Sequence, residues 1–99
     1  MLAFRLTLKV KPGCMDKAVE LAQSVKFAPD WKGRIYASGM GSYCPGDILI
    51  FEEVYESVAE REAYWEKKFD NPELIAWWDE WNEIAESGGS MEVWNLIEV

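Results

Sequence analysis

The chain contains no histidine among its 99 residues. Histidine is the side chain that titrates nearest to neutral pH, and it is the commonest metal ligand in proteins. Its absence excludes every reaction scheme that needs a histidine base and every metal or haem site that needs a histidine ligand.

Cysteine is also scarce, with only Cys14 and Cys44 present and no CxxC spacing. Two distant cysteines are too few for a disulfide framework or a zinc site, so we expect the reduced thiols of a cytoplasmic protein. A single disulfide between them stays open as the alternative. Cys44 has no histidine that could activate it as a nucleophile. We expect no metal and no organic cofactor, because ligand clusters and glycine-rich phosphate loops are missing.

Long hydrophobic runs and an excess of positive charge are missing as well. Arg5 interrupts the apolar start, and no stretch of about 18 uncharged apolar residues occurs, so neither a signal peptide nor a membrane span is predicted. The chain has 18 acidic and 10 basic residues, which gives a net charge of −8. Because polyanions would be repelled, we expect no nucleic-acid and no membrane partner.

The composition that remains is that of a globular protein, with 49% hydrophobic and 28% charged residues. The length predicts one domain over residues 1–99. A domain of this size buries only a modest core, and association with a second copy would add buried area.

Alternation of apolar and polar residues predicts the strands of this domain. The predicted strands are Phe4–Val10, Arg34–Met40, Ile48–Tyr55 and Met91–Val99. Turn-forming residues fill 41–47, so the second and third strands are expected to form an antiparallel hairpin.

Apolar residues at three- and four-residue steps predict the helices. The first covers Met15–Val25, after the strand-breaking Pro12-Gly13. Ser57 and Glu60 form a capping box, in which the glutamate side chain returns to the serine amide, and start a helix that runs to about Phe69. Asn71-Pro72 then starts a helix with an apolar stripe from Leu74 to Ala85, which Ser87-Gly88-Gly89 is expected to end.

The order of these elements predicts an α+β, ferredoxin-like βαββααβ fold. Its four-stranded antiparallel sheet carries the helices on one face. The uncovered face is expected to be mixed, with Arg5, Thr7 and Lys9 on the first strand and Arg34 and Tyr36 on the second.

The strand end FEEVYESVAE (Phe51–Glu60), the earlier strand exit at Lys11-Pro12-Gly13 and the tryptophan-bearing helices resemble the dimeric α/β-barrel superfamily. That superfamily includes antibiotic-biosynthesis-monooxygenase-like and NIPSNAP-like domains of similar length. The resemblance implies a homodimer in which two sheets pack face to face into a barrel with the helices outside. It also implies a ligand in the cleft between each sheet and its own helices.

Active members of the superfamily include cofactor-independent oxygenases, isomerases, dehydratases and haem-degrading enzymes. This chain departs from some of them because it has no histidine. Where some relatives have one near the end of the second helix, it reads Phe69-Asp70-Asn71-Pro72.

The tryptophan-rich helices offer the first set of candidate ligand-binding residues. Aromatic faces give a flat ligand a large contact area, and indole N–H groups add a polar handle. The candidates are Tyr64, Trp65, Trp78 and Trp81. Core packing explains the same residues and is the stronger interpretation. At least one of Trp77, Trp78 and Trp81 should lie near a surface or cavity, since the three cannot share one narrow helical stripe.

The strands offer a second set, formed by Arg34, Tyr36 and Glu52. Arg34 and Tyr36 differ by two positions, so they share a face and could bind a carboxylate or phenolate; hydrogen bonding at a dimer interface is the alternative. Glu52 and Glu53 point to opposite faces, and one of them points into the fold. A buried carboxylate there could act as a general base, although pairing with Arg5, Lys9 or Arg34 would make it structural.

Two functions of different classes follow from these residues. In the first, a cytoplasmic homodimer binds a small hydrophobic or aromatic compound and carries cofactor-free oxygenase or isomerase chemistry. In the second, the domain is a non-catalytic interaction or dimerisation module. A closed cavity lined by the tryptophans would favour the first function, and an exposed aromatic patch the second.

Overall fold

The computed structural model describes residues 1–25, 28–39 and 46–99. The elements in chain order are β1 (Leu2–Val10), α1 (Met15–Gln23), β2 (Arg34–Ala37), β3 (Ile48–Tyr55), α2 (Val58–Glu66), α3 (Pro72–Ile84) and β4 (Ala85–Asn95). The sheet has four strands in the order β2-β3-β1-β4, with every pairing antiparallel. The predicted ferredoxin-like fold is confirmed.

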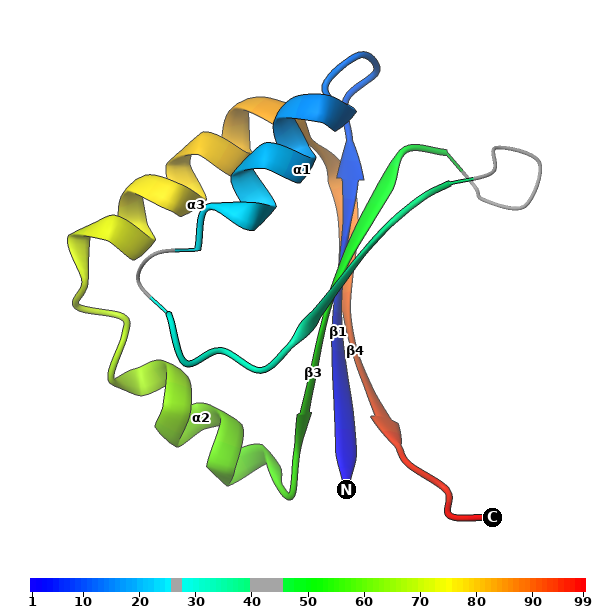
Figure 1. Ribbon diagram of the computed structural model, residues 1–99, viewed down its shortest axis with the longest axis vertical. Coiled ribbons are helices and arrows are strands. Elements are labelled where there is room, and N and C mark those ends of the chain that lie inside the picture. Colours follow the sequence, from blue (N-terminus) through cyan, green and yellow to red (C-terminus); the bar gives the residue numbers. More distant parts are fainter. Residues whose placement is uncertain (26–27, 40–45) are drawn as a thin grey trace.

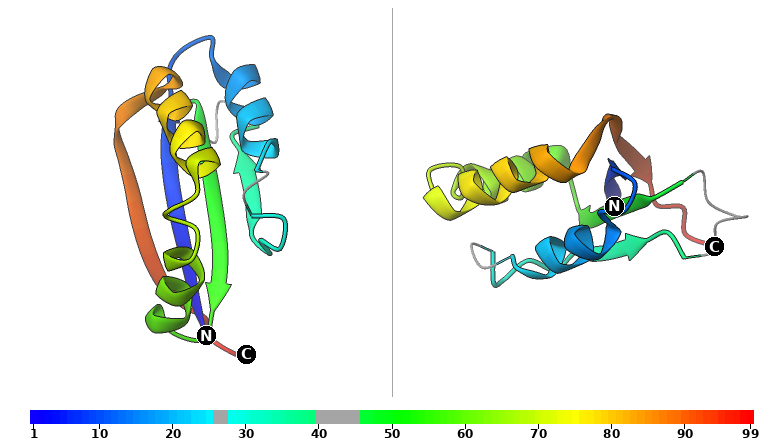
Figure 2. Two further views of the ribbon diagram at one scale, coloured as in Figure 1. Left: turned by 90° about the vertical axis from the view of Figure 1, so that its left-hand side faces the viewer. Right: turned by 90° about the horizontal axis from the view of Figure 1, so that it is seen from above.

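All three helices cover one face of the sheet, and no described element covers the other (Figure 1, Figure 2). The register of β1 against β3 decides which side chains face the helices. Leu6 lies opposite Phe51. Phe51 belongs to the hydrophobic core, and Leu6 packs against that core. Arg5 lies opposite Glu52, one position along, and so both point to the open face.

The core lies between the sheet and the helices α1 and α3. Its largest fully buried side chains are Trp81 and Leu49. The Phe51 ring meets Trp77, Trp81 and Trp31 edge to face, with ring centroids 5.7, 5.8 and 6.3 Å away. One strand residue thereby connects α3 to the segment before β2.

The predicted helix starts are present, with one difference. The Ser57 hydroxyl accepts from the Glu60 amide at 3.2 Å, but the Glu60 carboxylate accepts from the Glu56 amide at 2.9 Å and not from Ser57. The Asn71 side chain accepts from the Glu73 amide at 2.9 Å, directly before the proline that opens α3.

The predicted last strand, Met91–Val99, is wrong at both ends. The chain passes from α3 into β4 at Ala85, whose backbone is extended, and Ala85 already pairs with Val10. The glycines expected to end the helix lie inside β4, where the register against β1 shifts between Thr7 and Lys9. Glycine in a strand often marks such a bulge. A Cβ at Gly89 would lie 2.7 Å from the Thr7 carbonyl oxygen, so this close approach needs glycine.

The predicted second strand is also shorter than expected and ends at Ala37. Most of the predicted 41–47 turn, including Cys44, lies outside the described residues. Within the described ranges, no helix is long and apolar enough to cross a membrane.

Candidate functional site

Glu53 is a carboxylate buried on the helix-covered side of the sheet. It is 7% exposed and continues the inward row of Leu49 and Phe51 along β3. An acidic side chain in this row needs hydrogen-bond partners, because an unpaired carboxylate in an apolar setting is very costly.

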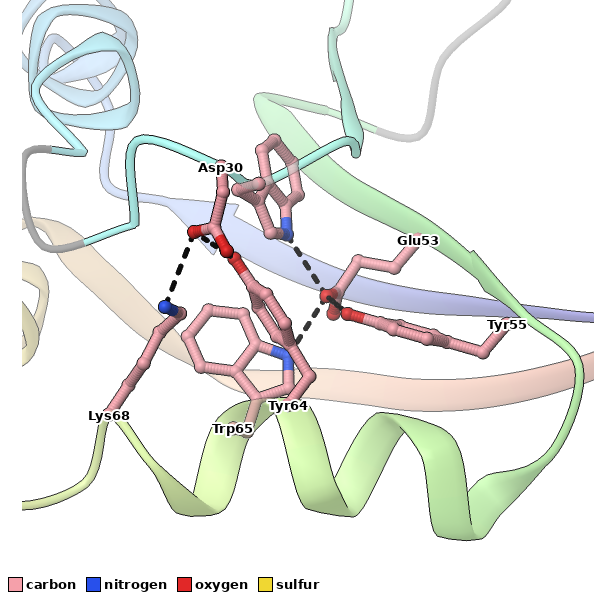
Figure 3. Close-up of polar contacts among 7 residues, drawn as sticks. Asp30, Glu53, Tyr55, Tyr64, Trp65 and Lys68 are labelled. Carbon is pink, nitrogen blue, oxygen red and sulfur yellow. Dashed lines mark hydrogen bonds and ion pairs between the residues drawn. The ribbon is translucent and has the colours of Figure 1, made fainter.

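Four donors converge on this carboxylate from three parts of the chain. Figure 3 shows two of them, Tyr55 and Trp65, directed at Glu53. Its Oε2 accepts from the Tyr55 hydroxyl at 2.6 Å, the Trp65 indole at 2.9 Å and the Trp31 indole at 3.0 Å. Its Oε1 faces the Arg61 Nε at 3.4 Å. The carboxylate therefore joins β3, α2 and the segment before β2.

A second polar cluster lies beside the first and is more exposed. The Tyr64 hydroxyl donates to Asp30 Oδ1 at 3.1 Å, and Lys68 Nζ lies 3.3 Å from the same oxygen. The Lys68 ammonium also lies 4.5 Å from the centroid of the Tyr64 ring, which adds a cation–π contact. The bond from Tyr64 lowers the pKa of the Asp30 carboxyl.

Both tyrosine hydroxyls are held in their neutral form. Burial, and then the hydrogen bond to Glu53, raise the pKa of Tyr55 well above its usual range. Burial, and then the hydrogen bond to Asp30, do the same to the pKa of Tyr64. At these two hydroxyls, burial and the neighbouring carboxylates therefore both disfavour the phenolate form.

Glu53 lies in the wall between two hollows. The larger is a polar cleft of about 370 Å³, lined by Asp30, Lys32, Gly33, Glu53, Val54, Tyr55, Glu60 and Tyr64. The smaller is an aromatic cavity of about 50 Å³, lined by Leu6, Val25, Trp31, Phe51, Glu53, Trp65, Trp77 and Trp78. Pockets for drug-sized ligands have volumes of roughly 300–1,000 Å³, so of these two hollows the polar cleft is the one large enough for such a ligand.

Gly33 allows Trp31 to reach the carboxylate. A Cβ at Gly33 would fall inside the Trp31 ring. The indole therefore folds over a backbone position that has no side chain, with its N–H directed at Glu53.

We expect Gly33→Ala to displace the Trp31 ring and break its bond to Glu53. The lost hydrogen bond would lower the free energy of unfolding by about 1–3 kcal/mol, because Trp31 would lose a partly buried acceptor. Urea denaturation followed by tryptophan fluorescence measures the change. Gly39→Ala is the matched control, since a Cβ there meets nothing within 4 Å. Equal losses for the two variants would contradict this role of Gly33.

The candidate residues predicted on the helices are distributed over these features. Tyr64 lines the polar cleft, and Trp65 and Trp78 line the aromatic cavity. Trp81 is 1% exposed and belongs to the core, whereas Trp78 is 38% exposed. The expectation that at least one of the three tryptophans on α3 lies near a surface or cavity is confirmed.

Arg34, Tyr36 and Glu52 lie on the opposite, open face of the sheet. Glu52 forms an ion pair with Arg5 at 2.6 Å and accepts from the Tyr36 hydroxyl at 3.3 Å. Arg34 is the cross-strand neighbour of Glu52. Tyr36 and Arg5 also line a hollow of about 530 Å³ on this face. The predicted set is thus divided between two faces that share no cavity among those described.

Sequence reasoning did not select the residues that complete the two polar clusters. These are Trp31, Glu53, Tyr55 and Arg61 in the buried cluster and Asp30 in the more exposed one. A signal for Glu53 was available, because it shares the odd-numbered face of β3 with Leu49 and Phe51. The sequence contained no comparable signal for Trp31, because this residue belongs to an irregular segment. Within the described ranges, no group of three metal-binding side chains comes together.

No family model and no curated protein sequence matches the chain. Solved structures do match it. A NIPSNAP domain protein from Burkholderia xenovorans is 13% identical with a TM-score of 0.80, covering 98% of this chain and 95% of its own. A NIPSNAP family protein from Agrobacterium tumefaciens is 10% identical with a TM-score of 0.75, covering 95% of this chain and 86% of its own. An antibiotic biosynthesis monooxygenase is 12% identical with a TM-score of 0.67, covering 99% of this chain and all of its own. The resemblance seen in the sequence is confirmed for the fold, which this chain shares with NIPSNAP and antibiotic-biosynthesis-monooxygenase-like domains.

Proposed function

We propose that the protein binds a small hydrophobic or aromatic compound in the polar cleft between its sheet and its helices. The observation that carries the proposal is the buried Glu53 carboxylate, which is held by four donors and forms part of the cleft wall. Aromatic rings and a fixed polar group at one site are typical of small-molecule pockets.

The chemistry that this proposal includes is oxygenation or isomerisation without a cofactor. One structure of the same fold is an antibiotic biosynthesis monooxygenase. In this chain, Glu53 would be the group placed to accept a hydrogen bond or a proton from the bound compound, and Tyr64 would line the same cleft.

Ligand binding can be tested by titrating the protein with phenols, quinones, flavin, haem and fatty acids. Trp31 and Trp65 both contact Glu53, so a ligand in the cleft should change tryptophan fluorescence in a saturable way. The same ligand should raise the melting temperature, because it binds only the folded state. If no compound does both, small-molecule binding is contradicted.

The proposal includes a homodimer in which the open sheet faces pack together. This face carries apolar residues at Ile48, Ile50 and Val54, next to the Arg5–Glu52 ion pair. An apolar face of this kind would be stabilised by burial. Sedimentation at micromolar concentration should therefore give twice the monomer mass of 11.4 kDa. A species of 11.4 kDa would refute the dimer.

The second candidate function, a protein-interaction module, has one observation in its favour. Large apolar side chains are exposed on β4 and after it, at Met91, Val93, Trp94, Leu96 and Ile97. Exposed apolar patches mark interaction sites, and the pairing with β1 places Met91 and Val93 on the helix side of the sheet and Trp94 on the open side. This function predicts that the ligand panel gives no response.

A further inference from the structure

We propose that Glu53 selects, among aromatic compounds, those that present a neutral O–H group, by accepting this hydrogen bond at its Oε1 atom. The inference rests on the proposed function, because it specifies which compounds the polar cleft would take. Three features of the cluster support it.

The first feature is the unequal use of the two carboxylate oxygens. Oε2 accepts three hydrogen bonds, of 2.6, 2.9 and 3.0 Å. Among the residues that the structure describes, Oε1 has one hydrogen-bond contact, at 3.4 Å, with Arg61. A carboxylate has about four lone-pair sites over its two oxygens, so Oε1 retains capacity while Oε2 is fully used. Any further donor that reaches Glu53 should therefore bind Oε1.

The second feature is the charge around that oxygen. Arg61 already faces the Glu53 carboxylate, so a cationic ligand at Oε1 would meet a like charge. An anionic ligand would meet Asp30, Glu53 and Glu60 in the cleft lining, against Lys32 in the lining and Arg61 beside the carboxylate. A neutral donor avoids both repulsions.

The third feature is a phenol that the chain itself binds to this carboxylate. Tyr55 donates to Oε2 at 2.6 Å, and its ring meets Phe4 edge to face at 5.9 Å. The raised pKa of Tyr55 shows that this phenol stays protonated beside the carboxylate. A ligand hydroxyl that donates to Oε1 would form a second hydrogen bond of the same kind on this carboxylate.

Three naphthalenes that differ only in their polar group test the inference by calorimetric titration of the wild-type protein. These are 2-naphthol, 2-methoxynaphthalene and 2-naphthoate. We expect the naphthol to bind about tenfold more tightly than the methoxy compound, because only the naphthol can donate to Glu53. The naphthoate should bind most weakly, because it brings a negative charge to an acidic wall.

A chromophoric phenol tests the protonation state independently of these affinities. When 4-nitrophenol binds at a pH where the free compound is largely ionised, its absorption should shift toward that of the neutral phenol. A site that stabilised phenolates would give the opposite shift. Glu53→Gln should reduce the preference for naphthol, whereas Glu60→Gln, which changes another carboxylate in the same lining, should keep it.

The outcomes separate the two proposals. Binding of all three naphthalenes with equal affinity, tighter binding of the naphthoate, or binding of nitrophenolate would overturn the selection by Glu53 and leave the cleft as a ligand site. If none of the naphthalenes and no compound of the wider panel binds, the proposed function fails, and the inference fails with it.

Discussion

Replacing Glu53 by alanine is expected to lower the free energy of unfolding by about 3–5 kcal/mol, the usual cost of removing one partner from a buried ion pair. The substitution removes the acceptor of the hydrogen bonds from Trp31, Trp65 and Tyr55 and the carboxylate of the ion pair with Arg61. A domain of this size has a total stability of about 5–15 kcal/mol. Urea denaturation should therefore show a much lower midpoint or a protein that is largely unfolded without denaturant.

Glu52→Ala is the matched control because it removes the same side chain from the adjacent position on the other face. Glu52 pairs with Arg5, whose side chain is 48% exposed, and exposed pairs contribute about 0–1 kcal/mol. The loss should be correspondingly small when both variants are compared at one protein concentration. If Glu52→Ala proves as destabilising as Glu53→Ala, the buried cluster is not what connects β3 to α2.

Trp81→Ala is the second substitution for which we expect a large effect, a loss of about 3–5 kcal/mol. Trp81 is 1% exposed and packs edge to face on Phe51 and Trp77, with centroids 5.8 and 5.6 Å away. Truncating the indole to a methyl group would open a cavity where α3 meets the sheet. The midpoint of urea denaturation measures this loss.

Two further substitutions show whether burial is the cause. Trp78→Ala removes the same side chain from the same helix at a position that is 38% exposed, so its effect should be much smaller. Trp81→Phe keeps an aromatic ring and removes the Trp81 Nε1, a buried donor that has no partner in the described structure. Because an unsatisfied buried donor is costly, Trp81→Phe should be much milder than Trp81→Ala. Similar losses for Trp78→Ala and Trp81→Ala would contradict the assigned role of Trp81.

Local sequence patterns were sufficient for most of the fold. Alternation along β1 and β3 and the capping residues Ser57 and Asn71 each act over a few neighbouring positions, so they can be interpreted without the partner segments. The end of α3 could not be predicted in this way. Gly88 and Gly89 resemble a helix stop, but pairing with β1 places them in a strand, and that pairing joins residues far apart in sequence.

The site was harder to predict because its partners come from separate segments. Strand alternation correctly placed Glu52 and Glu53 on opposite faces, and the apolar row of Leu49 and Phe51 indicated that Glu53 points inward, but alternation could not identify the donors that hold it. Two of these donors are Trp31 and Trp65, which lie 22 and 12 positions from Glu53. Trp31 further depends on the missing side chain of Gly33, a steric condition that appears only once the indole is placed.

The position of β1 in the sheet also constrains how the chain can fold during its synthesis. β1 is made first, yet it lies between β3 and β4 and pairs with both. Until the residues of β4 leave the ribosome, one edge of β1 has no strand beside it, and an open strand edge can pair with other chains. Contacts between such distant segments also slow folding. The nascent chain therefore cannot complete its sheet until Ala85–Asn95 has been made.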